Sequence, residues 1–200
     1  MKLQRTFRAA ALVLALAFAA PLAHAAEAEQ FVRSKHTELT QLVNKSKGAA
    51  DEKKVEAAFD QVLDYDTLAR ESLKDFWAER TPEERAEFQE VLKRLVRSAY
   101  RKSLKRIGDY EVEYRGETKA EAGVLVKTVA KSRGNAREEP VSIDYVVREK
   151  DGKWQIVDIV TEGSSLVSNY RNQFRRIIKK QGFPELIKRM KTKLDKGDVG

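Results

Sequence analysis

Cysteine is absent from this 200-residue chain, and histidine occurs only twice, at His24 and His36. Without cysteine the chain forms no disulfide, so its fold must rest on packing alone. The scarcity of histidine argues against a Ser-His-Asp triad or a His-rich metal site, and no glycine-rich phosphate-binding loop is present. We therefore expect no catalytic residues, no bound metal and no cofactor, and we expect His36 to lie at the surface.

Long hydrophobic runs are also missing, with one exception near the start of the chain. The apolar run Ala9–Ala20 follows three basic residues and is broken by Pro21. It is too short to span a bilayer, which takes about 20 residues. Residues 23–25 read Ala-His-Ala, which is the small-x-small pattern that signal peptidase cleaves. This layout predicts a cleavable secretory signal over residues 1–25 and release of the remainder beyond the inner membrane.

The charge balance is moderately basic. The formal net charge is +8, and removing Lys2, Arg5 and Arg8 with the signal would lower it to +5. Such a charge permits anionic partners such as lipid headgroups, but it is weak evidence for nucleic acid, and we expect no nucleic-acid partner. The length of residues 26–200 suits one domain with a sizeable core, and we expect a monomer.

Helical periodicity dominates the first half of the chain. It predicts a helix over residues 29–47, a second that begins at Asp51 and a third that follows Asp66 and runs through Trp77. Residues 81–84, Thr-Pro-Glu-Glu, form a capping-box pattern that starts a long helix ending at Gly108. One face of this helix is basic, which indicates a solvated surface or, as the alternative, a docking or headgroup surface. The basic residues are Lys93, Arg94, Arg97, Arg101, Lys102 and Lys105.

The period then changes to two, which is typical of strands. Alternating or β-rich runs over residues 110–115, 122–131, 141–147 and 154–160 predict four strands with short connections. Helical spacing returns after Ser165 and continues, past a break at Gly182–Pro184, into a last helix. This order predicts an α+β fold: a twisted four-stranded antiparallel sheet enclosed by N- and C-terminal helices.

The segment from Trp154 to Phe174 resembles the signature of the MlaC family, also called the toluene-tolerance auxiliary family. The family shows a Trp-to-Asp strand, an acidic-Gly-x-Ser-Leu turn and then Asn-Tyr-Arg-x-Gln-Phe on a helix, and residues 169–174 read Asn-Tyr-Arg-Asn-Gln-Phe. Similarity to the family's N-terminal half is found at residues 64–70, Trp77, residues 81–84 and Phe88, and also at residues 100–104. A departure occurs at residues 71–74, Glu-Ser-Leu-Lys, where many relatives have a Leu-Gly pair at a helix junction.

This resemblance implies a periplasmic phospholipid-binding protein with an NTF2-like cone, in which a curved sheet and helices enclose a pocket for acyl chains. It further implies that phospholipid passes between an outer-membrane lipoprotein complex and an inner-membrane ABC transporter, which maintains the lipid asymmetry of the outer membrane. A close branch of the family is associated with hopanoid metabolism, so a hopanoid-type lipid is the alternative cargo.

We expect one face of the sheet and the helices above it to line the pocket. Core packing is the alternative for each residue, because pocket walls and cores look alike in a sequence. The predicted lining residues are Leu92, Val96, Ala99, Tyr100, Val124, Val126, Ile143, Tyr145, Val147, Val157, Ile159, Leu166, Val167 and Tyr170.

Two other functions remain as alternatives. Folds of this kind can host proton-transfer enzymes that use a buried carboxylate and a tyrosine. Strand alternation, however, places Asp144 and Tyr145 on opposite faces of the sheet, so they cannot act as a pair. It also turns Asp158 away from the predicted pocket. We expect Asp158 to pair with Arg171 instead, in a structural role. The second alternative is a periplasmic adaptor without a ligand, for which the interior would be filled.

Overall fold

The computed structural model describes residues 20–197. Residues 1–19 of the predicted signal lie outside the described residues, so the signal stays a prediction. Within the described residues no helix is long and apolar enough to cross a membrane. Helices precede and follow one sheet, so the α+β prediction is confirmed. The helices are α1 (Ala20–Lys45), α2 (Ala49–Val62), α3 (Tyr65–Leu73), α4 (Asp75–Ala78), α5 (Pro82–Lys105), the 3₁₀ turn η1 (Ile107–Asp109), α6 (Leu166–Gln181) and α7 (Phe183–Lys196).

The sheet is antiparallel, and its strands follow one another in chain order. Short connections join neighbouring strands, and the β3–β4 hairpin turns at Asp151 and Gly152, which both have positive φ angles. This meander keeps the inward residues of successive strands on one face of the sheet. The strands are β1 (Tyr110–Ala120), β2 (Gly123–Ser132), β3 (Val141–Lys150), β4 (Lys153–Thr161) and β5 (Ser164–Ser165).

The sheet has five strands in the described residues, and the prediction of four was wrong in this detail. The additional strand β5 has two residues, which is too short to show a period of two in the sequence. Glu162 and Gly163 have φ angles of 48° and 73°, which matches the type I′ turn of a tight hairpin. Ser165 then accepts a hydrogen bond from the Ser168 N–H and so also caps α6.

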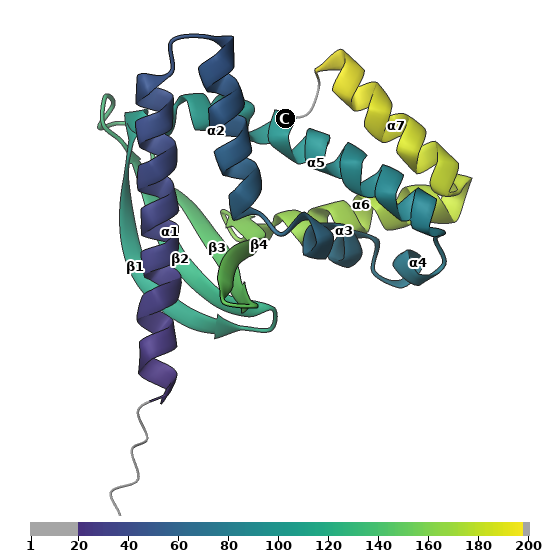
Figure 1. Cartoon of the computed structure of the whole chain (residues 1–200), viewed down its shortest axis with the longest axis horizontal. Coiled ribbons are helices and arrows are strands. Elements are labelled where there is room, and N and C mark those ends of the chain that lie inside the picture. Colours follow the sequence, from purple (N-terminus) through teal and green to yellow (C-terminus); the bar gives the residue numbers. More distant parts are fainter. Residues whose placement is uncertain (1–19, 198–200) are drawn as a thin grey trace, which may run out of the picture.

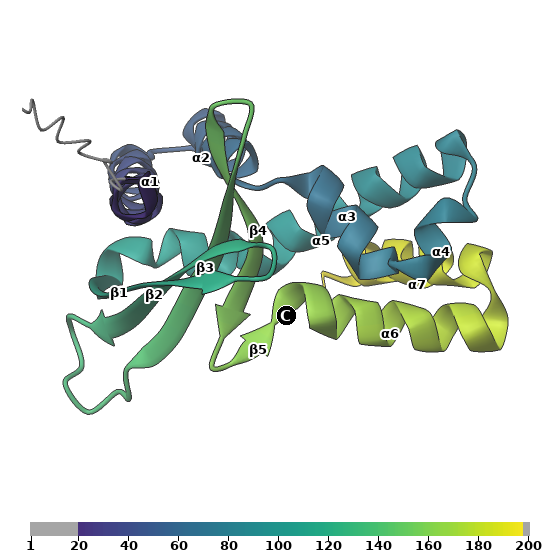
Figure 2. The same cartoon turned by 90° about the horizontal axis from the view of Figure 1, so that it is seen from below.

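The molecule has two adjoining halves: the sheet with α1 and α2, and a helical half that consists of α3 to α7. Figure 1 shows α1 and α2 as a hairpin that lies across the sheet, whereas α3 to α7 gather beyond the β4 edge. Figure 2, turned by 90°, shows α1 nearly end-on above the sheet. The α1–α2 hairpin therefore covers one sheet face, and the remaining helices mostly pack against one another.

Aromatic side chains pack between α5, α6 and α7. Phe88 of α5 is fully buried, and its ring lies edge-on to that of Phe174 of α6 with centroids 5.5 Å apart. The ring of Phe183, at the start of α7, lies 6.2 Å from Phe88. Long helix α5 begins as predicted, with a capping box between Thr81 and Glu84 and with Pro82 as its first residue. These rings hold α5, α6 and α7 together and belong to the same buried cluster as Ile156 and Ile159 of the sheet.

The third predicted helix is interrupted. Its residues form α3 and the short α4, which are separated by Lys74 with a φ angle of 49° and a ψ angle of −114°. The break was missed because the apolar spacing continues across it. Lys74 is the last of the four residues, 71–74, at which the sequence departs from the family resemblance. Glycine adopts positive φ angles without steric cost, whereas a lysine there is strained.

We expect Lys74→Gly to stabilise the protein by about 1 kcal/mol, because it relieves this backbone strain. The lost contact with Glu71 is an exposed ion pair that contributes little. The matched control is Lys53→Gly in the middle of α2, where an exposed lysine has helical geometry. That change should destabilise the protein by roughly 0.5–1 kcal/mol. Denaturant unfolding of both variants measures the two shifts, and shifts of the same sign would contradict the strain at Lys74.

Candidate functional site: an apolar cavity between the sheet and α1–α2

A cavity of about 420 Å³ lies between the sheet and the helices that cover it. Its volume falls within the range of ligand pockets, roughly 300–1,000 Å³. The walls come from α1, α2, the end of α5, η1 and strands β1 to β4. Segments that are far apart in the chain therefore meet around one space, and most of the side chains that line it are apolar.

The sheet supplies a continuous apolar floor. Ala130 of β2 pairs with Val112 of β1 on one side and with Val141 of β3 on the other, and all three residues line the cavity. Tyr145 of β3 pairs with Ile159 of β4, and both also line it. Since residues directly opposite each other on paired strands share a face, this register places small and β-branched side chains side by side beneath the helices.

The helices supply the roof. Val32 and Leu39 lie on α1 seven residues apart, which places them on one helix face. Phe59 and Val62 face the cavity from α2, and Tyr100 faces it from α5. The rings of Phe59 and Tyr100 are tilted against each other with centroids 6.0 Å apart. The roof was not predicted apart from Tyr100, although the apolar stripe of the first predicted helix contained both Val32 and Leu39.

His36 lies on the cavity wall and is half-buried, so the prediction that it is an ordinary surface residue was wrong. Burial lowers the pKa of its imidazole, and the positive charge of Arg133 lowers that pKa further. The ring is therefore neutral at pH 7. Its Nε2 is buried without a hydrogen-bond partner among the described residues. His36 thus contributes a neutral aromatic surface to the wall.

The remaining polar groups leave the cavity close to neutral. Lys35 and Arg106 reach its wall, but Glu38 lies 2.8 Å from the Lys35 Nζ and Asp109 lies 3.3 Å from the Arg106 Nε. Burial, and to a smaller extent the nearby Tyr170 and Asp158, raises the pKa of Tyr100 to about 12. The hydroxyl of Tyr100 therefore stays protonated at neutral pH. Among the described residues no carboxylate lines the cavity. The interior suits an uncharged apolar ligand.

Four of the predicted lining residues lie on the wall of this cavity: Tyr100, Ile143, Tyr145 and Ile159. The other ten do not line it. Leu92, Val96, Val126, Val147, Val157 and Val167 are buried in packed regions, whereas the remaining four are half-buried. Contact of these ten residues with a ligand stays a prediction. The half-buried residues are Ala99, Val124, Leu166 and Tyr170.

A β-bulge explains the placement of Val157. Val146 pairs with Asp158, but Val147 pairs with Ile156, so Val157 has no partner of its own. The additional residue changes the strand alternation, with the result that Ile156 and Ile159 both line the cavity and Val157 does not. A strict period of two, as assumed from the sequence, groups Val157 with Ile159 instead.

Position along the strands explains Val124 and Val147. These residues are paired with each other near the start of β2 and the end of β3, away from the loop that joins the two strands. Ala130 and Val141 are paired near the opposite ends of the same strands, and the cavity lies there. Alternation predicts which face a residue occupies, but it does not predict where the helices stand away from that face.

Both carboxylates that an enzyme of this fold could use are engaged in structural contacts. Asp158 accepts hydrogen bonds from the Ile159 and Val167 backbone N–H groups and from the Ser165 hydroxyl. The expected pair of Asp158 with Arg171 is not formed, because Arg171 contacts the carboxylate of Glu71 at 3.0 Å. Asp158 therefore ties β4 to the start of α6.

Asp144 is engaged in the same way, since it accepts a hydrogen bond of 2.9 Å from the Thr128 N–H. Neither Asp144 nor Asp158 reaches the cavity wall. Among the described residues, moreover, no group of three or more His, Asp or Glu side chains is arranged to hold a metal ion.

A smaller hollow of about 290 Å³ lies between α1, α2 and α5. Its border includes Glu52, Glu56, Arg101 and Lys105, and these side chains form ion pairs between α2 and α5. Burying charged groups beside an acyl chain is costly. The hollow is therefore a poor site for an apolar ligand, and the larger cavity is the candidate.

These features define an α+β domain in which a sheet and a helical hairpin enclose an apolar cavity. The chain belongs to the MlaC family: the family model described as MlaC protein matches residues 33–192. The chain is also similar to the structure of a phospholipid-binding protein from Ralstonia solanacearum in complex with a phospholipid, with a TM-score of 0.73 and 24% identity over 86% of this chain and 98% of that chain. At that identity the likeness shows a shared fold. Among the curated proteins none matches.

Proposed function

We propose that this chain is a periplasmic phospholipid carrier that uses no cofactor and catalyses no reaction. The apolar cavity beneath α1 and α2 carries the proposal, because its wall contains no carboxylate from the described residues and is apolar over most of its surface. Membership of the MlaC family supports the assignment. The phospholipid in the similar Ralstonia solanacearum structure supports phospholipid as the ligand.

The energetics of lipid carriage require transfer between two membranes. Two acyl chains contain roughly 30 carbons, and burying each CH₂ contributes about 0.8 kcal/mol. Release of such a lipid into water is therefore far too costly. The lipid must pass from a membrane into the cavity and on to a second membrane, so that the apolar burial nearly balances at both ends.

Membership of the MlaC family supports a proposal for the partners. We propose an outer-membrane lipoprotein complex at one end of the route and an inner-membrane ABC transporter at the other, with the carrier as a diffusing monomer between them. Such a role maintains the lipid asymmetry of the outer membrane. A hopanoid-type lipid in the cavity would keep the carrier role and change the cargo.

A transfer assay tests the carrier role. Donor vesicles contain a self-quenched fluorescent phospholipid, acceptor vesicles contain none, and dequenching reports transfer. We expect the purified protein to accelerate transfer in proportion to its concentration. Acceptor vesicles held behind a membrane that passes protein but not vesicles should still receive lipid. Transfer that requires contact between vesicles, or no acceleration at all by folded protein, would contradict a diffusing carrier.

A further inference from the structure

The basic face of α5 is not a free surface. Arg97, Arg101 and Lys105 follow one another at intervals of four residues, and each forms an ion pair with α2. Their partners Asp60, Glu56 and Glu52 follow in the reverse order, also four residues apart, and Lys93 contacts Asp60 as well. Acidic side chains of α2 therefore neutralise most of the basic face, which argues against the docking role considered for it.

The net positive charge of the chain resides in α6 and α7. Between Leu166 and Lys196 the sequence contains ten Lys and Arg residues and two acidic residues, so these two helices carry a formal charge of +8. The whole chain also carries +8. The remainder of the chain, which has 29 basic and 29 acidic residues, is neutral in sum. No acidic residue at all occurs in α6.

Most of these cations lack an internal partner. Arg171, Arg189 and Lys191 form ion pairs with Glu71, Glu185 and Glu87. The other seven are exposed and form no ion pair with any residue between 20 and 197; we call them the α6–α7 basic surface. These residues are Arg175, Arg176, Lys179, Lys180, Lys188, Lys193 and Lys196.

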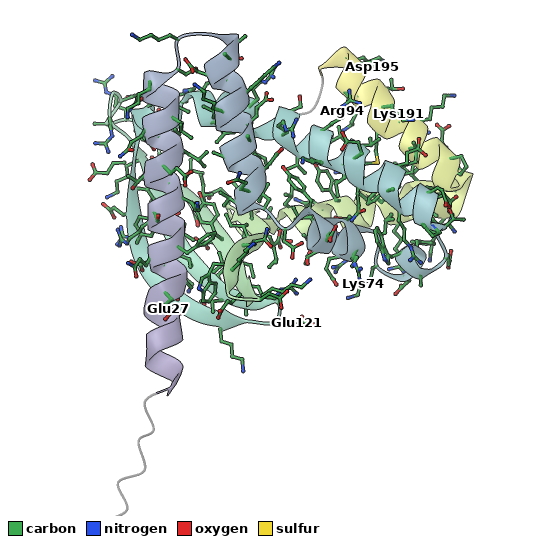
Figure 3. The ribbon with its side chains drawn as sticks, in the orientation of Figure 1. Glu27, Lys74, Arg94, Glu121, Lys191 and Asp195 are labelled. Carbon is green, nitrogen blue, oxygen red and sulfur yellow. The ribbon has the colours of Figure 1, made fainter. Side chains whose placement is uncertain are left out.

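The apolar side chains of the same helices are turned inward. Phe174 on α6 and Leu186, Ile187 and Met190 on α7 are buried in the helical core. The two helices form a hairpin at the end of the molecule that lies away from β1 (Figure 1). Figure 3 shows Lys191 on α7 far from Glu27 on α1, the helix that covers the cavity. Contact through this surface would thus be electrostatic, without insertion of apolar groups, and would leave the cavity free.

We propose that the α6–α7 basic surface docks the protein reversibly on the anionic surface of a lipid bilayer. Each Lys or Arg near an anionic membrane strengthens binding roughly fivefold, and the attraction falls off within about 10 Å at 0.1 M salt. Seven unpartnered cations on one helical hairpin are enough for weak, salt-sensitive adsorption. A bilayer fits better than a small anion held in a pocket, because the cations are spread along two helices and none of them lines either of the two hollows described above. The docking does not depend on lipid carriage.

Vesicle flotation tests this surface. The purified protein is mixed with vesicles of phosphatidylglycerol and phosphatidylcholine, or of phosphatidylcholine alone, at about 20 mM and about 500 mM salt. We expect at least about tenfold stronger binding to the anionic vesicles at low salt and loss of that preference at high salt. Equal binding to both vesicles would overturn the proposal. Absence of vesicle binding would overturn it too and would leave an acidic protein as the partner for this surface.

Two charge-matched variants locate the contact. R175Q/R176Q/K179Q/K180Q removes four cations from α6, whereas K53Q/K119Q/K127Q/K153Q removes four exposed cations from other elements. The α6 variant should lose at least about tenfold in affinity for anionic vesicles, and the control should change by less than about threefold. Equal losses would show that overall charge alone is responsible and would overturn the proposal. Lipid extracted from the α6 variant should match that of the unchanged protein, which separates docking from cavity binding.

Discussion

Replacing Ala130 with tryptophan is expected to prevent lipid binding while leaving the protein folded. Ala130 is a small residue in the middle of the cavity floor, between Val112 and Val141. A tryptophan side chain there extends into empty space and removes no existing packing. Displacing even two CH₂ groups costs about 1.6 kcal/mol, which is more than a tenfold loss of affinity. We expect the lipid bound per protein to fall at least about tenfold.

The matched control for this variant is Ala122→Trp, which adds the same side chain at the exposed turn between β1 and β2. The control should keep its full lipid content. Extraction and quantification of lipid from both purified variants, together with thermal unfolding, makes the comparison. The melting temperature of Ala130→Trp should be equal to or above that of the unchanged protein, because the new ring fills a cavity. A folded Ala130→Trp protein with full lipid occupancy would show that lipid is bound elsewhere.

Replacing Asp64 with alanine is expected to produce the largest loss of stability from a single polar side chain. Asp64 is 9% exposed and joins the two halves of the molecule. Its carboxylate accepts hydrogen bonds from the Thr67 N–H and hydroxyl at 2.9 and 2.7 Å and from Arg148 of β3 at 3.1 Å. Its own N–H donates to the Ile156 carbonyl of β4 at 2.9 Å.

Loss of the Asp64 carboxylate removes the cap of α3 and leaves the half-buried N–H and hydroxyl donors of Thr67 without this acceptor, which together cost about 2–3 kcal/mol. The ion pair with Arg148 adds little, because Arg148 is 39% exposed. The control is Asp75→Ala, which removes the same group from an exposed position and should change stability only slightly. Urea unfolding measures both variants. A loss at Asp64 no greater than that at Asp75 would contradict the role assigned to this junction.

The stability that Asp64 contributes should depend on pH. Burial by itself raises the pKa of this carboxyl, but the hydrogen bonds from Thr67 and the charge of Arg148 outweigh it, so the pKa lies below its ordinary value of 3.8. A depressed pKa in the folded state stabilises the protein above the pKa of the unfolded state and loses this effect as the pH falls through the folded-state pKa. The gap between the unchanged protein and Asp64→Ala should be constant from pH 5 to 7 and narrow below pH 3.8.

The fold was predictable wherever a pattern repeated. The capping box at Thr81 and the alternation around Tyr145 predicted α5 and β3, because periodic burial of apolar side chains determines both. Single-residue irregularities were not predictable. The helix break at Lys74 and the bulge at Val157 leave the apolar spacing unchanged, and β5 is too short to have a period. Such features depend on backbone geometry that one sequence does not display.

The sequence predicted the apolar character of the site better than it predicted which residues line it. The family resemblance indicated an apolar pocket on the sheet, and Tyr145 and Ile159 lie on its wall. Predicting the residues of the roof requires knowing that α1 and α2 cover this face, which depends on tertiary packing. The same limit applies to charge. The basic face of α5 appeared free in the sequence, but in three dimensions Glu52, Glu56 and Asp60 neutralise it.

Direct analysis of the bound lipid tests the central claim, that the cavity carries a phospholipid. The protein is purified from cells without detergent and extracted with organic solvent, and the extract is analysed by quantitative mass spectrometry beside an equal amount of Ala130→Trp. We predict phospholipid in a near-stoichiometric amount with the unchanged protein and at least about tenfold less with the variant. A folded, unchanged protein that yields no lipid of any class would contradict the account.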